Sequence, residues 1–325
     1  MHSWWLVVCG RNKMAKKKLP REVSLVREYK VEKYDTKENK NISYSQYSIY
    51  STCPHQWYLS YPKKLAPYTP SIHTVFGTAL HETVQNWLDV AYNESVKASE
   101  EINLPEYLID RMKKTYKKER FNNANKDFTT PQELQEFHND GVAILDHLKK
   151  KRPVYFSTKS TYLVGVEVPL VLPLKPGLYF KAYLDLVFYN EALGKYLILD
   201  IKTSTKGWSD YEKKSDTKIS QVLFYKEFFA KQFNTDVENI DVEFFIVRRK
   251  IYEGGEFVPK RVQQFRPASG KIKRGQAMAN LSKFVEEAFT DTGEYVEKEY
   301  LKNASKNNCR FCPFNKSPLC NAAIL

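Results

Sequence analysis

Two short stretches decide the fold of this chain: Lys181-Ala-Tyr-Leu-Asp-Leu-Val-Phe188 and Tyr196-Leu-Ile-Leu-Asp-Ile-Lys202. Both are rich in the apolar and aromatic residues typical of strands, and residues 190–195 between them include a glycine, as hairpin connections often do. Asp185 and Asp200 are equidistant from the middle of that connection. A symmetric antiparallel hairpin therefore places the two carboxylates opposite each other, with Cβ atoms about 4.5–5.5 Å apart.

The second of these strands has apolar residues on both faces, which indicates a central, buried strand. Two facing carboxylates there repel each other, and buried charges must be paired or bind a metal. We therefore expect a hard divalent cation, Mg²⁺ or Mn²⁺, bound by Asp185 and Asp200. Lys202 points to the same face as Asp200 and could orient a water or neutralise charge on a phosphate. The pattern leaves one alternative open, an Asp200–Lys202 ion pair on an edge strand with Asp185 exposed.

The rest of the chain contains further strand-like and helix-like segments, which predict an α/β fold with a mixed central sheet flanked by helices. Strands are expected at 162–172, 178–189, 196–203 and 242–248. Helices are expected at 43–61 with a break at Cys53-Pro54, at 74–92, from Pro131 to about 150, at 220–233 and at 276–289. Thr130-Pro-Gln-Glu133 has the form of a capping box at the start of the third of these helices.

The domain organisation follows from where these patterns begin and end. We expect a basic N-terminal arm over residues 1–42 and a single domain over 43–325. Within that domain, residues from about 93 to 152 form a helical insertion, and residues 303–325 form a segment that carries three cysteines. Residues 1–13 are expected to be an upstream or artificially added extension, with Met14 as the natural start.

Composition favours an anionic partner, because 51 Lys and Arg against 38 Asp and Glu give a formal net charge of +13. The basic excess lies in the arm, at 111–120 and in Arg248-Arg249-Lys250, which are candidate walls of a DNA channel. No apolar run approaches the roughly 20 residues of a membrane-spanning helix, and the apolar stretch at residues 4–9 lacks the flanks of a signal peptide. We expect no membrane association, a cytoplasmic location and reduced cysteines.

Three further polar side chains fit a site built around the hairpin. His81 lies on the apolar side of the helix at 74–92 and Glu82 on its polar side, so His81 is the better candidate ligand; a buried core histidine is the alternative. Gln221 and Tyr225 are four residues apart and share one face of the helix that follows the second strand. They could contact a phosphate or support Lys202.

Taken in order, these motifs resemble the RecB-like branch of the PD-(D/E)XK nuclease superfamily, which includes the nuclease domains of the RecB and AddB helicase–nucleases and the CRISPR-associated adaptation exonucleases. The matching motifs are Gly77-Thr-Ala-Leu-His81, Asp185 in a strand, Asp200-Ile-Lys-Thr203 and Gln221-x-x-x-Tyr225. The resemblance implies that His81, Asp185, Asp200 and the backbone carbonyl of Ile201 bind the divalent metal, that Lys202 is the catalytic lysine, and that Gln221 and Tyr225 complete the site. Ala182 departs from the family, which often has Gly there.

Four cysteines form a second candidate centre. Cys309, Cys312 and Cys320 lie in a Pro-containing loop, and Cys53 is the candidate fourth ligand. Four cysteines can hold tetrahedral Zn²⁺ or an iron–sulfur cluster, and their spacing does not separate the two; free buried thiols are a further alternative. The resemblance implies a [4Fe–4S] cluster, because an iron–sulfur subset of RecB-like nucleases joins one cysteine ahead of the domain to three at its end. The gap between the last two cysteines is longer than is common there. The centre would hold the two ends of the domain together.

The sequence thus predicts a metal-dependent DNA nuclease that hydrolyses phosphodiesters. The resemblance alone implies an exonuclease on single- or double-stranded DNA ends, in recombination, repair or phage DNA processing, with a possible recombination or helicase partner. A hypothesis from another class is a non-catalytic nucleic-acid-binding module that keeps the fold and the cysteine centre.

Overall fold

A six-stranded mixed sheet forms the centre of the protein in the computed structural model, which describes residues 19–31, 39–252, 254 and 258–321. The strands are β1 (Lys40–Ile42), β2 (Thr161–Lys175), β3 (Leu178–Asn190), β4 (Lys195–Ser204), β5 (Ile240–Arg248) and β6 (Val262–Phe265), in the order β1-β3-β4-β5-β6 with β2 also paired to β3. The β1–β3 and β4–β5 pairs are parallel and the other pairs are antiparallel. The predicted α/β class with a mixed sheet is confirmed, and β4 is a central strand as expected.

One edge of β3 is interrupted. β2 pairs along the whole of β3, whereas β1 pairs only with residues 178–180 and β4 only with residues 186–190. Because β2 occupies one edge throughout, β1 and β4 must share the other. Among the residues that the structure describes, none pairs with 181–185 on that edge, and the sheet has an opening there between β1 and β4.

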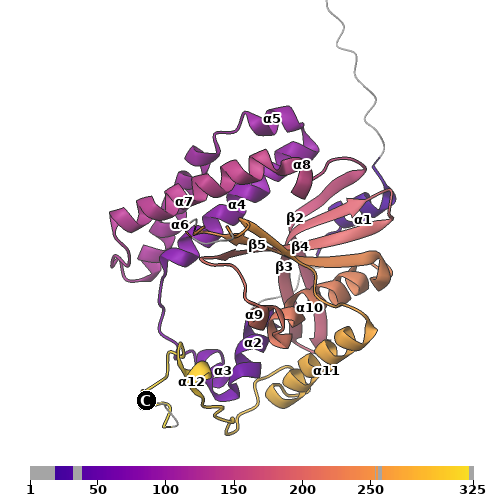
Figure 1. Cartoon of the computed structure of the whole chain (residues 1–325). Helices are drawn as coiled ribbons and strands as arrows, with labels where there is room; N and C mark the ends of the chain where they lie inside the picture. Colours follow the sequence, from indigo (N-terminus) through magenta and orange to yellow (C-terminus); the bar gives the residue numbers. More distant parts are fainter. Residues whose placement is uncertain (1–18, 32–38, 253, 255–257, 322–325) are drawn as a thin grey trace, which may run out of the picture.

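Helices cover both faces of the sheet (Figure 1). One layer holds α4 (Ile72–Asn93), α5 (Val96–Glu100), α6 (Leu104–Asn122), α7 (Pro131–Lys150) and α8 (Arg152–Tyr155). The other holds α2 (Tyr44–Thr52), α3 (Pro54–Ser60), α9 (Asp210–Lys213), α10 (Asp216–Gln232) and α11 (Lys271–Ala288), with the short elements α1 (Arg21–Arg27), η1 (Val237–Asn239) and α12 (Lys306–Cys309) at the periphery. Each layer has its own core: Phe156 packs on both Trp87 and Phe245 in the first, and Phe224 and Phe284 belong to the second.

The expected elements are present with small shifts at their ends. The helix break at Cys53-Pro54 separates α2 from α3, because Cys53 is extended and Pro54 begins the next helix. Thr130 caps α7 by accepting a hydrogen bond from the backbone N–H of Glu133 at 3.1 Å. Glu133 does not complete the capping box, since its carboxylate accepts a hydrogen bond from the hydroxyl of Thr129 instead.

Part of the segment expected as a basic arm is folded into the core. Val23 and Val26 of α1 are buried, and Arg27 donates hydrogen bonds to the carbonyls of Leu163 and Val164 on β2. β1 then continues the sheet. The sequence did not predict that α1 packs on the core, because only two of its apolar residues face inward and charged residues surround them. The expected extension at 1–13 lies outside the described residues.

Candidate active site

The β3–β4 hairpin has the register that the sequence predicts. Leu186 lies opposite Leu199 and Asn190 opposite Lys195, so paired residue numbers have a constant sum. Gly194 in the connection has a φ of +63°, a backbone conformation that glycine adopts without a Cβ clash. The ladder ends at Leu186–Leu199. Asp185 and Asp200 would form the next pair, but they lie just beyond the last hydrogen-bonded pair.

The two strands separate at this point, and the separation places the side chain of Asp185 against the backbone of β4. Its Oδ2 accepts a hydrogen bond from the N–H of Ile201 at 2.7 Å. In a continued ladder a backbone group of β3 would pair there instead. The first carboxylate therefore lies directly at the opening between β1 and β4.

Asp200 is the most buried member of the site, with 3% of its surface exposed. Its Oδ1 accepts a hydrogen bond from Nε2 of Gln221 at 3.1 Å, and the same amide donates to the hydroxyl of Tyr225 at 2.8 Å. The Nζ of Lys202 lies 2.7 Å from Oδ2 of Asp200, which makes an ion pair without the angles of a hydrogen bond. The i, i+4 pair on α10 therefore supports Asp200, rather than Lys202 as one expectation had it.

His81 reaches the same place from α4. Its Nδ1 lies 3.7 Å from Oδ2 of Asp185, and a quarter of its side chain is exposed. Burial and the charge of Lys202 lower the pKa of His81 to about 4. The imidazole is therefore neutral at pH 7, which is the form that binds metals.

Burial has the opposite effect on the two carboxyls. It raises the pKa of Asp185 and that of Asp200 to about 6 each, although the charge of Lys202 opposes the shift in both. Burial alone would lower the pKa of Lys202, but Asp200 and Asp185 outweigh it, and the pKa lies above its usual value. Lys202 is therefore a cation at neutral pH, and the carboxylates are held in a place that favours protons or another cation.

Two residues that the sequence interpretation missed hold Asp185 in place. Nε2 of Gln85 donates to the backbone carbonyl of Asp185 at 3.1 Å and to Oε1 of Glu167 at 2.7 Å. Glu167 has a φ of +50° and lies opposite Asp185 in the β2–β3 register, between the pairs on either side. Gln85 could have been found, since it follows His81 by four residues on one helix face. The positive φ of Glu167 could not be predicted from the sequence, because no glycine or turn motif stands there.

The donor set fits a small hard cation. Within the described residues no three His, Cys, Asp or Glu side chains converge as a complete metal site. Mg²⁺ does not require one, because it is commonly bound by one or two carboxylates and keeps several waters. Asp185 and Asp200 supply such carboxylate oxygens and His81 a neutral nitrogen, and the partner of Oδ2 of Asp200 is the Nζ of Lys202 at 2.7 Å. The residues present therefore fit Mg²⁺ or Mn²⁺.

A comparison of the chain with known protein families shows one family that it matches over most of its length. The profile of the PD-(D/E)XK nuclease superfamily matches residues 41–320. This chain belongs to the PD-(D/E)XK nuclease superfamily. Nucleases of this superfamily are hydrolases, typically use Mg²⁺ or Mn²⁺, and act on nucleic acid.

Comparisons with individual proteins add little to this PD-(D/E)XK assignment. No curated protein matches the chain. Among solved structures, the chain is similar to the crystal structure of SSO0001, with 13% identity and a TM-score of 0.28 over 86% of this chain and 97% of that one.

The four cysteines line one small cavity beside the PD-(D/E)XK core. Cys53 lies between α2 and α3, and Cys309, Cys312 and Cys320 reach it from the C-terminal segment. Hydrogen bonds join the same two parts: Asn303 and Asn308 donate to the carbonyl of Thr52. Trp57 of α3 also packs on Tyr300 and Phe289. The four cysteines therefore line the same cavity, but within the described residues they do not form a group that could hold a metal ion.

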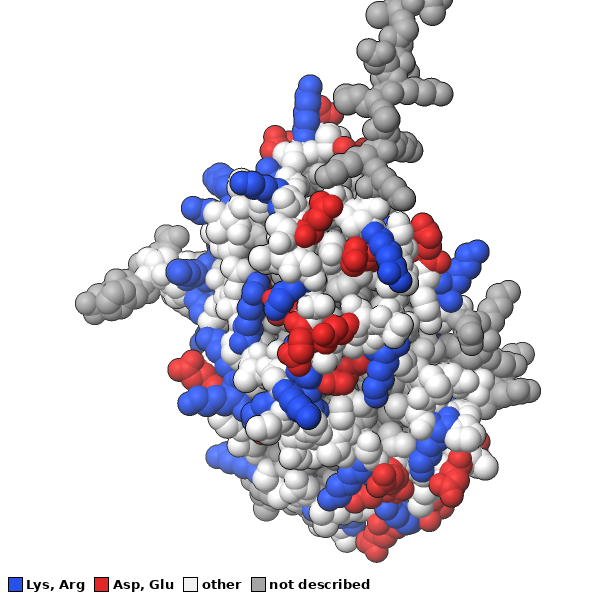
Figure 2. All heavy atoms as spheres, turned by 90° about the vertical axis from the view of Figure 1, so that its right-hand side faces the viewer, with Lys and Arg blue, Asp and Glu red and all other residues white. Residues whose placement is uncertain are grey.

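The basic segments proposed as channel walls are partly occupied by acidic partners. Arg249 is ion-paired with Asp140 of α7 at 2.5 Å and lies over the ring of Phe137, and Lys250 is ion-paired with Asp140 and Glu136. Arg249 therefore joins α7 to the sheet, and its charge is largely balanced by acidic partners. Figure 2 shows basic side chains interspersed with acidic ones on one face.

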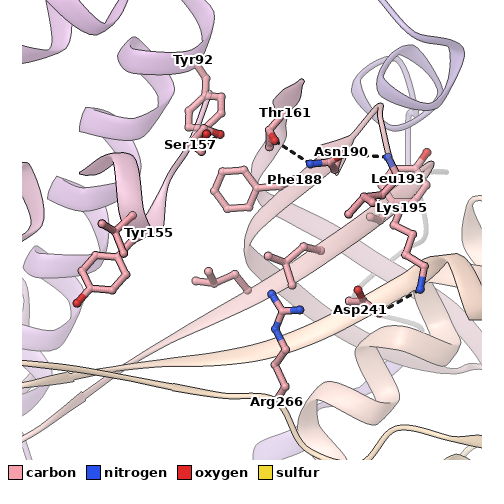
Figure 3. A pocket seen from close by; sticks show the side chains of 14 residues that line it. Tyr92, Tyr155, Ser157, Thr161, Phe188, Asn190, Leu193, Lys195, Asp241 and Arg266 are labelled. Carbon is pink, nitrogen blue, oxygen red and sulfur yellow. Dashed lines mark hydrogen bonds and ion pairs between the residues drawn. The ribbon is translucent and has the colours of Figure 1, made fainter. Parts of the chain in front are cut away.

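A separate hollow at the turn end of the hairpin contains none of the predicted site residues. Its rim carries Tyr92, Tyr155 and Phe188 on one side and Lys195 and Arg266 on the other (Figure 3).

No helix among the described residues has the length and apolarity to cross a membrane.

Proposed function

We propose that this protein is a divalent-metal-dependent deoxyribonuclease of the RecB-like type that acts on DNA ends. The observation that carries the proposal is the convergence of His81, Asp185, Asp200 and Lys202 at the opening between β1 and β4, supported from α10. A buried pair of carboxyls with raised pKa values costs stability, and structural needs alone do not explain it.

His81, Asp185, Asp200 and the carbonyl of Ile201 are the groups that would hold the cation. The bound ion would supply Lewis-acid polarisation of the phosphate and an activated water. Lys202 would place its positive charge beside the phosphate, where negative charge grows in the transition state. Gln221 keeps Asp200 aligned through the hydrogen bonds described above, and Asp185 is fixed by Ile201 and Gln85.

We further propose a [4Fe–4S] cluster bound by Cys53, Cys309, Cys312 and Cys320, with Zn²⁺ as the competing occupant. The single cavity supports this proposal, because four sulfur ligands from two distant parts of the chain surround it. A cytoplasmic location and a role in recombination, repair or phage DNA processing, with a helicase or recombination partner, complete the proposal.

Two substitutions test the catalytic proposal. Asp200→Ala and Lys202→Ala are expected to lower the rate of Mg²⁺-dependent degradation of end-labelled DNA by at least about 10²–10³-fold, because the first removes a ligand of the cation and the second removes the positive charge beside the reacting phosphate. Lys195→Ala is the matched control, since Lys195 begins the same strand and pairs only loosely with Asp241, at 3.8 Å.

Circular dichroism must show that all three variants fold. Wild-type rates in both Asp200→Ala and Lys202→Ala would disprove the site assignment. DNA binding by the wild type without cleavage under Mg²⁺, Mn²⁺, Ca²⁺ or Co²⁺ would instead favour the non-catalytic binding module.

A further inference from the structure

The hollow at the turn end of the β3–β4 hairpin (Figure 3) lies away from the candidate active site. Asn190 lines it, and Asp185 precedes Asn190 by five residues of an extended strand, about 17 Å. The volume of the hollow is about 220 Å³, roughly seven times the 30 Å³ that one water occupies in the liquid. It therefore has room for one large side chain.

The inside of the hollow is apolar, and so is part of its rim. Phe188 of β3 and Leu197 and Leu199 of β4 line the inside. The rim includes Val154 of α8 and Leu193 of the hairpin connection, which are 70% and 71% exposed. Exposed apolar side chains around an apolar recess are typical of a place where another molecule buries an apolar group.

The aromatic rings of the hollow are already packed against other rings. Tyr92 lies against Phe188 with ring centres 5.4 Å apart, and Tyr155 lies edge-on to Phe245 at 5.5 Å. The hydroxyl of Tyr92 also donates to the carbonyl of Ser157 at 3.0 Å. A nucleic-acid base needs a free ring face on which to stack, so the recess suits a compact apolar side chain better than a base.

Two basic side chains at the rim have acidic partners. Lys195 is ion-paired with Asp241 at 3.8 Å, and the Nε of Arg266 donates to the carboxylate of Glu243 at 2.6 Å. Each pair is neutral overall. The charge that a ligand would meet at the hollow must therefore come from elsewhere.

Three further basic residues follow one another where α7 leads into α8: Lys150, Lys151 and Arg152. Among the residues that the structure describes, no carboxylate forms an ion pair with them, although Asp146 lies one helical turn before Lys150. Arg152 donates to the carbonyl of Phe156 at 3.5 Å, which leaves its charge unneutralised. Cations are favourable at a helix C-terminus in any case, so the argument rests on where these three lie.

These three cations lie along the wall of the hollow. Burial raises the pKa of Tyr92, which lines the hollow, and the nearby charge of Arg152 opposes that increase. Burial lowers the pKa of His147, and nearby charges that include Lys150 lower it further. The Nε2 of His147 lies 3.4 Å from the hydroxyl of Tyr155, another lining residue. An apolar recess and an unneutralised positive charge therefore lie side by side.

We propose that the hollow and the run Lys150-Lys151-Arg152 form a docking site for an acidic peptide segment of a partner protein. One apolar side chain of the segment fills the recess, and its carboxylates lie beside the three cations. Charge complementarity selects this occupant, because a buried anchor gives affinity and a charged rim gives specificity and a fast association. DNA has the required charge but no projecting apolar side chain. The inference does not depend on the proposed nuclease function.

Fluorescence anisotropy with three labelled peptides tests the docking site, in EDTA and without DNA. The first peptide has about 12 residues, with Asp and Glu on both sides of a central Phe-Leu pair. The second has Gly-Gly at the centre, and the third has Asn and Gln in place of the acids. The first is expected to bind with a Kd of about 10–100 µM, and the other two at least about tenfold more weakly, because each lacks one half of the recognised pattern.

Two substitutions at exposed positions separate the recess from the charge. Val154→Asp is expected to weaken binding of the first peptide at least about tenfold, and Ile272→Asp, at an exposed position of α11, is its control. Lys150→Glu is expected to weaken it about three- to tenfold. Lys231→Glu is the matched control, because Lys231 also lies in the last turn of a helix, α10.

Three results would overturn the docking site. They are equal affinity of the first two peptides, equal losses in Val154→Asp and Ile272→Asp, and no binding of the first peptide at about 1 mM. A loss of affinity for a blunt DNA duplex in Lys150→Glu that equals the loss for the first peptide would identify nucleic acid as the occupant instead. Because no DNA or divalent metal is present in the peptide measurements, failure of the nuclease proposal would not change their outcome.

Discussion

Individual residues of the site are held in an arrangement that is unfavourable without a cation. Asp185 is mostly buried, lies beside Asp200, and has a pKa raised to about 6. Such a carboxyl binds its proton more tightly in the folded protein than in the unfolded chain, where its pKa is about 3.9. Between these two values the folded state binds more protons, so the metal-free protein loses stability as the pH rises from about 4 to about 6.

Asp185→Asn is therefore expected to raise the Tm of the protein in EDTA at pH 7.5. The gain should be absent at pH 4 and grow up to about pH 6, because Asn does not titrate, and it corresponds to at most about 3 kcal/mol. Thermal unfolding from pH 4 to pH 8 measures it. Added Mg²⁺ should then stabilise the wild type more than the variant at pH 7.5. A Tm difference that does not change with pH would contradict the assigned burial cost.

At the scale of elements, the hairpin depends on one glycine. Gly194 has a positive φ and open space where a Cβ would lie, so Gly194→Ala carries a backbone cost of about 1–2 kcal/mol and no clash. Gly275 is the matched control, because it also has open space but lies on the exposed side of helix α11. Gly275→Ala is expected to stabilise the protein by about 0.5–1 kcal/mol. Urea unfolding measures the change in the free energy of unfolding of each variant. Destabilisation of equal size in both variants would show that the positive φ of Gly194 is not the cause.

The hairpin also shows how much the sequence could predict. Symmetry about the turn was enough to predict the register of β3 and β4, because the length of a hairpin connection determines which residues lie opposite each other. The separation of the strands at Asp185 could not be predicted, since it involves Gln85, which is distant in sequence and donates to the carbonyl of Asp185, and the positive φ of Glu167. β1 and β6 were missed because three or four residues show too little alternation.

At the scale of the whole molecule, the order of the motifs was sufficient to predict the PD-(D/E)XK superfamily, whereas the charge pattern did not predict which basic side chains have acidic partners in the fold. Arg249 illustrates the reason: a basic side chain in sequence gives no sign of the acids on α7 that neutralise it in the fold. Cys53 was predicted to lie near the three later cysteines because a closed zinc or iron–sulfur site needs four ligands and the C-terminal segment supplies three.

The cysteine centre is expected to hold the C-terminal segment against α3. Freshly purified protein should contain iron and show a broad absorption band near 400 nm, and Cys312→Ser should lose both and become more sensitive to trypsin at Lys302 and Lys306, because ligand loss frees the segment. Phe311→Ala is the control, since its ring is 83% exposed. Colourless protein with stoichiometric zinc would identify the other metal. Equal trypsin sensitivity of wild type and Cys312→Ser would exclude a structural role.

The contact between Asn308 and Thr52 joins residues 256 positions apart. Contacts of such separation form late, because a long loop must close before they stabilise anything. During synthesis α2 and α3 are made early but lack Tyr300 and Phe289 as packing partners until about 240 further residues have followed. A growing chain therefore cannot complete this wall of the protein before residues 289–308 have been made.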